Sequence, residues 1–128
     1  MVQKNLINVC SLNVNGINNR NKRERVIEWL KAHKCDIAFL QETHFDEKVS
    51  KEMSIQKDFN IFCSHGTTAS RGVAILIRSS LNVTVINENR DADGREILLN
   101  IQIDETIFTL VCIYAPNYKA SRNTFFKR

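Results

Sequence analysis

The chain has 128 residues, of which 43% are hydrophobic and 25% are charged, and it contains only four glycines and one proline. This balance indicates a globular protein and excludes a disordered or fibrous chain, and the length suits one domain or part of one. The formal net charge of +4 permits a polyanionic partner such as nucleic acid. It does not require one, because many proteins that bind no polyanion carry a similar excess of positive charge.

No apolar run approaches the roughly 20 residues that a membrane-spanning helix needs, so we expect no membrane partner. The N-terminal residues lead directly into a strand-like segment without the apolar core of a signal peptide, which indicates an intracellular protein. The cysteines form no C-x-x-C pair and have no zinc-ligand spacing. We expect them to be reduced and mostly buried thiols. They are Cys10, Cys35, Cys63 and Cys112.

The first part of the chain predicts strands on either side of the main helix. Residues 6–14 form an apolar, β-rich run that ends in a loop at Asn15-Gly16. Residues 21–34 form an amphipathic helix, with Asn19 or Asn21 as its N-cap. Residues 36–40 are almost continuously apolar, which is typical of a strand that is buried on both faces.

The rest of the chain predicts more strands and a short helix near 47–53, for six or seven strands in total. The last two strands form a hairpin across Asp104-Glu105. A helix is expected to begin within 118–128. The remaining predicted strands are 60–63, 72–78, 81–88, 95–104 and 106–114.

One main helix cannot cover both faces of such a sheet. Residues 72–77 (GVAILI) and 108–113 (FTLVCI) predict strands that bury apolar side chains on both sides. A second layer is therefore required. Either another chain or segment supplies it, or the chain by itself is only marginally stable.

Three polar clusters follow apolar strands, at 13–16, 41–44 and 114–117. The carboxyl ends of strands are where the sites of layered α/β folds gather. One carboxylate with several amides and a phenol suits Mg²⁺ better than zinc, which prefers His and Cys. Each cluster alone is an ordinary turn or strand end, so only their joint occurrence favours a site. Glu42 would bind the metal and Tyr114 would orient a phosphate.

Five motifs occur in a fixed order: LNVNG at 12–16, LQETH at 40–44, GVAILI at 72–77, DGR at 93–95 and IYAPN at 113–117. They resemble the endonuclease/exonuclease/phosphatase superfamily in its apurinic-endonuclease branch. LQETH, GVAILI and IYAPN are most similar to the endonuclease domains of LINE-type (non-LTR) retrotransposons.

The resemblance implies an α/β fold of the DNase I-like kind, a four-layer α/β/β/α sandwich with mixed, mainly antiparallel sheets. Residues 1–128 would be the N-terminal part of one such domain, one half of the sandwich with one main helix, truncated before the C-terminal half. The family continues with an Asp-x-Asn motif after a G-D-F-N-type strand, a further Asp and a terminal Asp-His pair, none of which follows here. His33, His44 and His65 do not stand in the context of that terminal His.

The resemblance also implies the roles of individual residues. Glu42 would bind the metal, Asn13 would lie in the active site, and Tyr114 would contact the scissile phosphate, so these three are the catalytic candidates. Substrate binding would involve Asn15 beside the metal, Arg95 on a phosphate or DNA, and Asn117 near Tyr114. Some relatives carry Asp at the position of Asn15.

The implied activity is Mg²⁺-dependent hydrolysis of phosphodiester bonds by a DNA endonuclease of a LINE-type retrotransposon or an apurinic-endonuclease-like protein, with Mn²⁺ as the alternative cation. We expect the chain alone to be inactive. The partners would be DNA, the missing C-terminal half and a reverse transcriptase in the parent protein, and the location would be the nucleus, with the cytoplasm as alternative. Two other functions stay open, a phosphomonoesterase or phospholipase of the same superfamily and a non-catalytic nucleic-acid-binding remnant.

Overall fold

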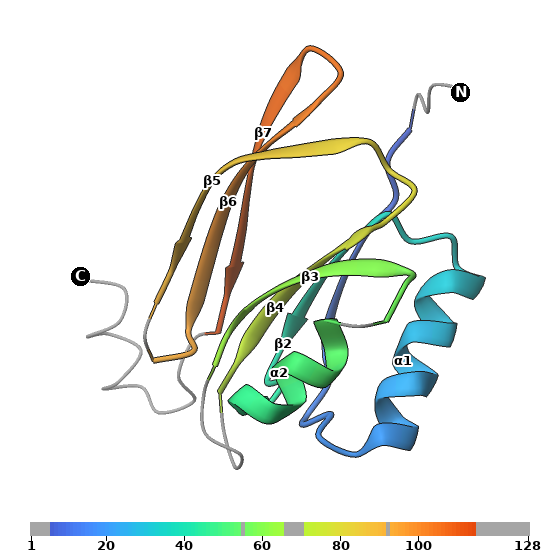
Figure 1. Cartoon of the computed structure of the whole chain (residues 1–128), viewed down its shortest axis with the longest axis vertical. Helices are drawn as coiled ribbons and strands as arrows, with labels where there is room; N and C mark the ends of the chain where they lie inside the picture. Colours follow the sequence, from blue (N-terminus) through green and yellow to red (C-terminus); the bar gives the residue numbers. More distant parts are fainter. Residues whose placement is uncertain (1–5, 55, 66–70, 92, 115–128) are drawn as a thin grey trace.

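The computed structural model describes residues 6–54, 56–65, 71–91 and 93–114, and this part of the chain forms two sheets and two helices (Figure 1). The first sheet has the strand order β1-β2-β4-β3 and the second has the order β5-β6-β7. The elements are β1 (Val9–Asn13), α1 (Arg20–Ala32), β2 (Ile37–Gln41), α2 (Glu47–Ser54), β3 (Phe59–Ser64), β4 (Val73–Arg78), β5 (Val83–Arg90), β6 (Glu96–Ile103) and β7 (Thr106–Ile113).

Strand β4 lies inside the first sheet and is buried on both faces. It pairs antiparallel with β2 on one side and with β3 on the other, whereas β1 and β2 are parallel. Its run of apolar side chains alternates between two cores. Ala74 and Leu76 face the helices, and Val73, Ile75 and Ile77 face the second sheet.

Both helices cover the same face of the first sheet (Figure 1). The side chain of Asn19 accepts a hydrogen bond from the N–H of Lys22 and so caps the start of α1, as the sequence predicts. Leu30 of α1 is fully buried, and Met53 of α2 is buried in the same core. None of the helices in the described residues is long and apolar enough to cross a bilayer.

The second sheet covers the other face of the first. Ile97, Leu99 and Ile101 of β6 are fully buried and pack in one core with Ile75 and its neighbours of β4. The expectation that another chain or segment supplies this layer is therefore wrong for β4. The chain covers it with its own second sheet, because every second residue of β6 is a large apolar one that points toward β4.

The outer face of the second sheet is open in the described part of the chain. Val111 and Ile113 of β7 are 40% and 42% exposed, so the prediction that 108–113 is buried on both sides is wrong here. Only the inner face of this strand, with Cys112, lies against the core. The hairpin between β6 and β7 turns at Asp104, as predicted, and α2 is the short helix expected near 47–53.

The four cysteines are free thiols, three of them buried, which confirms the prediction. Burial raises the pKa of Cys63 and the pKa of Cys112 to about 11. Burial, together with the neighbouring thiol of Cys10, raises the pKa of Cys35 to about 12. With these pKa values the three thiols are protonated at neutral pH. They are therefore unreactive, because only the thiolate reacts readily.

The packing of β4 predicts the effect of shortening one of its side chains. Ile75→Ala removes most of a fully buried side chain between the sheets and should lower the free energy of unfolding by about 2–5 kcal/mol, measured by urea denaturation. Ile86→Ala on β5 is the control, because Ile86 is 51% exposed and its loss should have little effect. Equal losses of stability for the two variants would contradict the two-sheet core.

Candidate functional site

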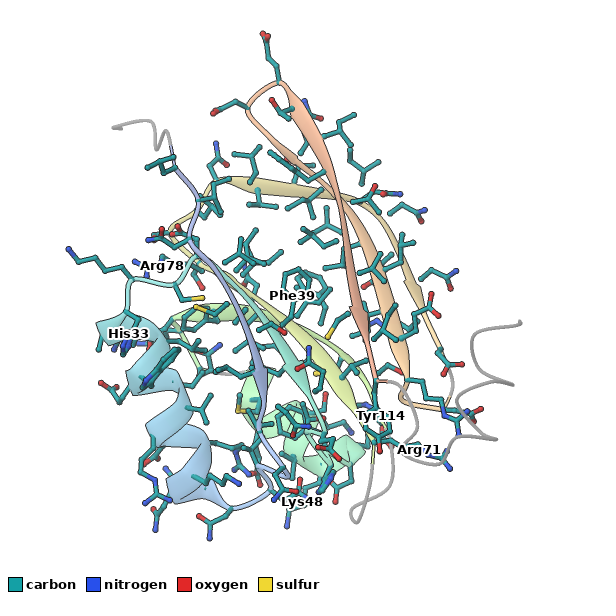
Figure 2. All side chains as sticks on the ribbon, turned by 180° about the vertical axis from the view of Figure 1, so that it is seen from behind. His33, Phe39, Lys48, Arg71, Arg78 and Tyr114 are labelled. Atoms are coloured by element: carbon teal, nitrogen blue, oxygen red, sulfur yellow. The ribbon has the colours of Figure 1, made fainter. Side chains whose placement is uncertain are left out.

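The pairing of the strands brings three of the predicted motifs together at one end of the first sheet, where β1 and β2 end and β4 begins. Strands β1 and β2 run parallel with Asn13 opposite Gln41, so both end here. Strand β4 runs the other way and begins here, with Val73 opposite Gln41. Figure 2 shows Arg71 and Tyr114 at this end of the sheets and Arg78, the last residue of β4, at the other.

The loop after β1 runs alongside the loop after β2. The N–H of Val14 donates to the carbonyl of Gln41 at 3.0 Å, and the N–H of Gly16 donates to the carbonyl of Glu42 at 2.6 Å. The N–H of Ile17 continues the series with a bond of 3.0 Å to residue 43. Backbone pairing therefore extends beyond the ends of both strands and holds the Asn13–Gly16 loop beside Glu42.

Further backbone hydrogen bonds connect Thr43 and His44 to the other motifs. Thr43 donates to the carbonyl of Gly72 and His44 donates to that of Arg71, both at 3.0 Å. The N–H of Gly72 donates to the carbonyl of Gly94 at 2.9 Å. Arg95 follows Gly94, and its carbonyl accepts from the N–H of Tyr114 at 2.7 Å. The segments that carry Asn13, Asn15, Glu42, Arg95 and Tyr114 thus form one hydrogen-bonded frame.

Backbone strain is concentrated in this frame. Asn15, Glu42, His44 and Arg71 all have left-handed backbone conformations, with φ of 48°, 55°, 58° and 65°. They are four of the six non-glycine residues with positive φ in the described part of the chain. Such conformations are unfavourable for L-residues and collect at functional sites, where the surrounding structure holds them in place.

The side chains of the frame are open to solvent to different degrees. Asn13 and Asn15 are exposed, and the Asn13 side-chain oxygen accepts a hydrogen bond of 3.0 Å from the N–H of Asn15. Glu42, Arg95 and Tyr114 are half-buried. The Nε of Arg95 is buried without a hydrogen-bond partner among the described residues. A buried donor without a partner is uncommon in folded proteins, which marks Arg95 as a notable residue of the frame.

Asn117 and the helix expected within 118–128 lie outside the described residues. For the other candidates the frame brings the segments together, while the chemical role of each side chain stays a prediction. Arg71 and Gly72 also belong to this frame, although the sequence did not indicate either of them as a site residue. Gly72 opens the GVAILI motif, and its φ of +91° is a conformation for which glycine is the usual residue.

The donor atoms of the frame suit a hard cation only in part. Glu42 offers one carboxylate, and Asn13 and Asn15 offer amide oxygens, which are ligands that Mg²⁺ accepts. Within the described ranges no group of three or more His, Cys, Asp or Glu side chains could hold a metal ion. The described residues would therefore supply only part of the ligands of a Mg²⁺ site.

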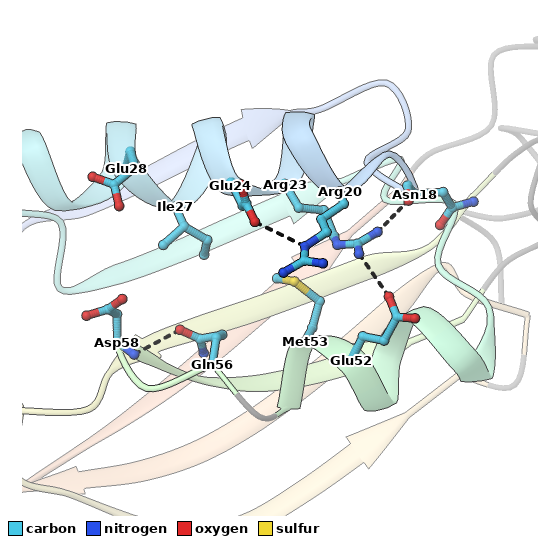
Figure 3. Close-up of a pocket in the computed structure, with 10 residues that line it drawn as sticks. All are labelled: Asn18, Arg20, Arg23, Glu24, Ile27, Glu28, Glu52, Met53, Gln56 and Asp58. Atoms are coloured by element: carbon cyan, nitrogen blue, oxygen red, sulfur yellow. Dashed lines mark hydrogen bonds and ion pairs between the residues drawn. The ribbon is translucent and has the colours of Figure 1, made fainter.

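A cleft of about 730 Å³ lies between α1 and α2 (Figure 3). Its arginines are already paired, Arg23 with Glu52 at 2.9 Å and Arg20 with Glu24 at 3.2 Å. The Arg23 guanidinium also donates to the carbonyl of Asn18. The bonds of Arg23 connect the two helices and the loop before α1, so we interpret the cleft as a structural contact between the helices.

The chain belongs to the endonuclease/exonuclease/phosphatase family, whose sequence model matches residues 10–126. Among its relatives is the transposon TX1 uncharacterized 149 kDa protein of Xenopus laevis. The two are 26% identical over 121 residues, which are 94% of this chain and 9% of that protein. This confirms the resemblance to the family and to a transposon protein.

Solved structures share the fold. The catalytic domain of Xenopus laevis APE2 is 25% identical, with a TM-score of 0.68 over 90% of this chain and 48% of that one. A humanized TDP2 of D. rerio is 16% identical, with a TM-score of 0.69 over 94% of this chain and 56% of that one. The fold is thus α/β and DNase I-like, as predicted, and the chain spans about half the length of these structures.

The frame predicts the effect of a side chain at Gly72. Gly72→Ala forces an L-residue to adopt a φ of +91°. The N–H and C=O of residue 72 both form hydrogen bonds to neighbouring segments, so the backbone cannot relax without breaking them. The free energy of unfolding should fall by about 1–2 kcal/mol in urea denaturation. The exposed turn residue Ser80, changed to Ala, should leave the unfolding midpoint unchanged. A Gly72→Ala protein as stable as that control would contradict the strained geometry.

Proposed function

We propose that this chain contributes one part of a Mg²⁺-dependent nuclease site that hydrolyses phosphodiester bonds in DNA. The observation that carries the proposal is the continuous backbone frame that joins the motif segments at one end of the sheets. The family and the transposon relative support it. Another D. rerio TDP2 structure of this fold is a complex with a single-strand DNA product. DNA as the substrate of this chain would favour a nuclear location.

Each residue of the frame would have the role that its chemistry suits, either binding the cation or contacting the phosphate. The Glu42 carboxylate would hold Mg²⁺, helped by the amide oxygens of Asn13 and Asn15. The bound cation would neutralise charge that develops on the phosphate. The Tyr114 hydroxyl would orient that phosphate, and the unsatisfied Nε of Arg95 would donate to a phosphate oxygen, with Asn117 as a further contact.

The sheets leave room for one more strand. The side of β1 that carries Ile7 and Val9 faces the second sheet, yet Val9 is 55% exposed, because three strands lie over four. Among the described strands β7 pairs only with β6, so its other edge is open on the side toward β1. We propose that a strand from outside the described residues pairs with β7 and covers β1. The C-terminal half implied by the family resemblance would supply it.

The two edges of the second sheet differ in a way that supports this proposal. Strand β5 has a bulge between Val85 and Asn87 and carries Glu88 and Arg90, all of which discourage further pairing. The open strand β7 has the sequence TIFTLVCI, with no charge and no irregularity of register against β6. Its edge is therefore suited to accept another strand.

The proposed metal ligand can be tested on the chain as it stands. Titration with Mn²⁺ should broaden the NMR amide signals of residues 13–16 and 41–44 first, with weak affinity because only one carboxylate contributes. Glu42→Gln keeps the size of the side chain and removes its charge, so the selective broadening should disappear. Glu47→Gln, on the exposed surface of α2, is the matched control and should leave it intact. Broadening that persists in the Glu42→Gln protein would exclude Glu42 as ligand.

The activity of the chain alone is a separate prediction. Because the motifs for the rest of the site do not occur in residues 1–128, incubation of the purified chain with supercoiled plasmid and Mg²⁺ should give little or no nicked product. The chain with Glu42→Ala is the control for contaminating nuclease. Robust nicking that Glu42→Ala abolishes would show that these residues suffice for the reaction.

A further inference from the structure

The ring of His44 lies directly against Gly16. A Cβ atom added to Gly16 would lie 2.6 Å from Nδ1 of His44, 3.2 Å from Cε1 and 3.4 Å from Cγ. Real Cβ atoms do not approach other heavy atoms to 2.6 Å, so the imidazole occupies the space that a side chain at residue 16 would need. Gly16 also has a φ of +80°. Glycine is therefore favoured here both by the backbone conformation and by the ring.

This contact bridges the two loops that carry the proposed ligands. The N–H of Gly16 binds the carbonyl of Glu42, and the backbone N–H of His44 is fixed by the carbonyl of Arg71. The His44 side chain thus reaches back across the peptide groups that follow Glu42 and rests on the neighbouring loop. On the opposite side, the bond to Arg71 holds the His44 backbone to the segment that leads into β4.

A shift of Gly16 would move the proposed metal ligands in the same loop, Asn13 and Asn15. Asn15 precedes Gly16, and its N–H is bound by the side-chain oxygen of Asn13. The distance between the Asn13–Asn15 loop and Glu42 therefore depends on how closely Gly16 lies against the loop of His44. Glu42 and His44 both have left-handed backbone conformations, which point their side chains away from the course of a regular strand.

We infer that His44 is a positioning residue, whose ring packs on Gly16 and sets the spacing between the Asn13–Asn15 loop and Glu42. The inference rests on the proposed metal site, which it deepens by naming the side chain that holds the site's two loops in register. The ring acts by its shape and not by its protonation. An aromatic ring of similar size should therefore replace it.

A double-mutant cycle tests the contact. His44→Ala should weaken Mn²⁺ binding about tenfold, as the loss of residues that orient metal ligands commonly does. Gly16→Ala should weaken it at least as much in the natural chain, and several-fold less in a chain that already carries His44→Ala, because the ring is then gone. His44→Phe should retain most of the affinity. His33→Ala, on the far end of α1, is the matched control and should change nothing (Figure 2).

A second measurement needs no metal. Hydrogen exchange of the Gly16 and Ile17 amides, which donate to residues 42 and 43, should become several-fold faster in the His44→Ala protein. The amide of Tyr114, bonded to Arg95, should keep its protection. If the natural chain binds no Mn²⁺, the proposed function fails, and amide exchange still decides the role of His44.

Two results would show that the ring does not position the two loops, and a third would show that its role is not steric. One is an equal effect of Gly16→Ala with and without the ring, since independent sites are additive. The other is unchanged exchange of the Gly16 and Ile17 amides after His44→Ala. A loss of affinity in the His44→Phe protein as large as in the His44→Ala protein would show that a ring nitrogen is needed, which contradicts a purely steric role.

Discussion

The register of β2 between its two neighbours determines where everything else in the molecule lies. Gln41, the last residue of β2, is opposite Asn13 on one side and Val73 on the other. A slip of one residue on either side would turn each apolar side chain of the shifted strand to the wrong face. It would also separate the Asn13–Gly16 loop from Glu42. The packing of both cores opposes such a slip, so the same burial that stabilises the fold also holds the site together.

Much of the fold could be predicted because the responsible signals are local. The continuous apolar run of β4, the turn at Asp104 and the capping side chain of Asn19 each act through near neighbours in the chain. The source of the layer over β4 could not be predicted in this way. It depends on which way the alternating side chains of β6 face after the chain has reversed direction several times, and periodicity leaves that direction open.

The candidate site divides in the same manner. Polar residues after apolar strands identified Asn13, Glu42 and Tyr114 as neighbours, and the backbone frame joins their segments. The left-handed conformation of Glu42 carries no sequence signal, because glutamate does not favour it. The contact of His44 with Gly16 needs coordinates as well. The family relationship narrows the chemistry to that of the endonuclease/exonuclease/phosphatase family.

The uncharged edge of β7 also has a consequence for the protein in concentrated solution. Within the described residues β7 is an eight-residue strand whose N–H and C=O groups on one side have no strand partner, and such an edge is a template on which other polypeptides can form β-structure. The edge of β7 is therefore a site at which the chain can aggregate when concentrated. A lysine on its outward face should keep the protein dispersed without disturbing the cores.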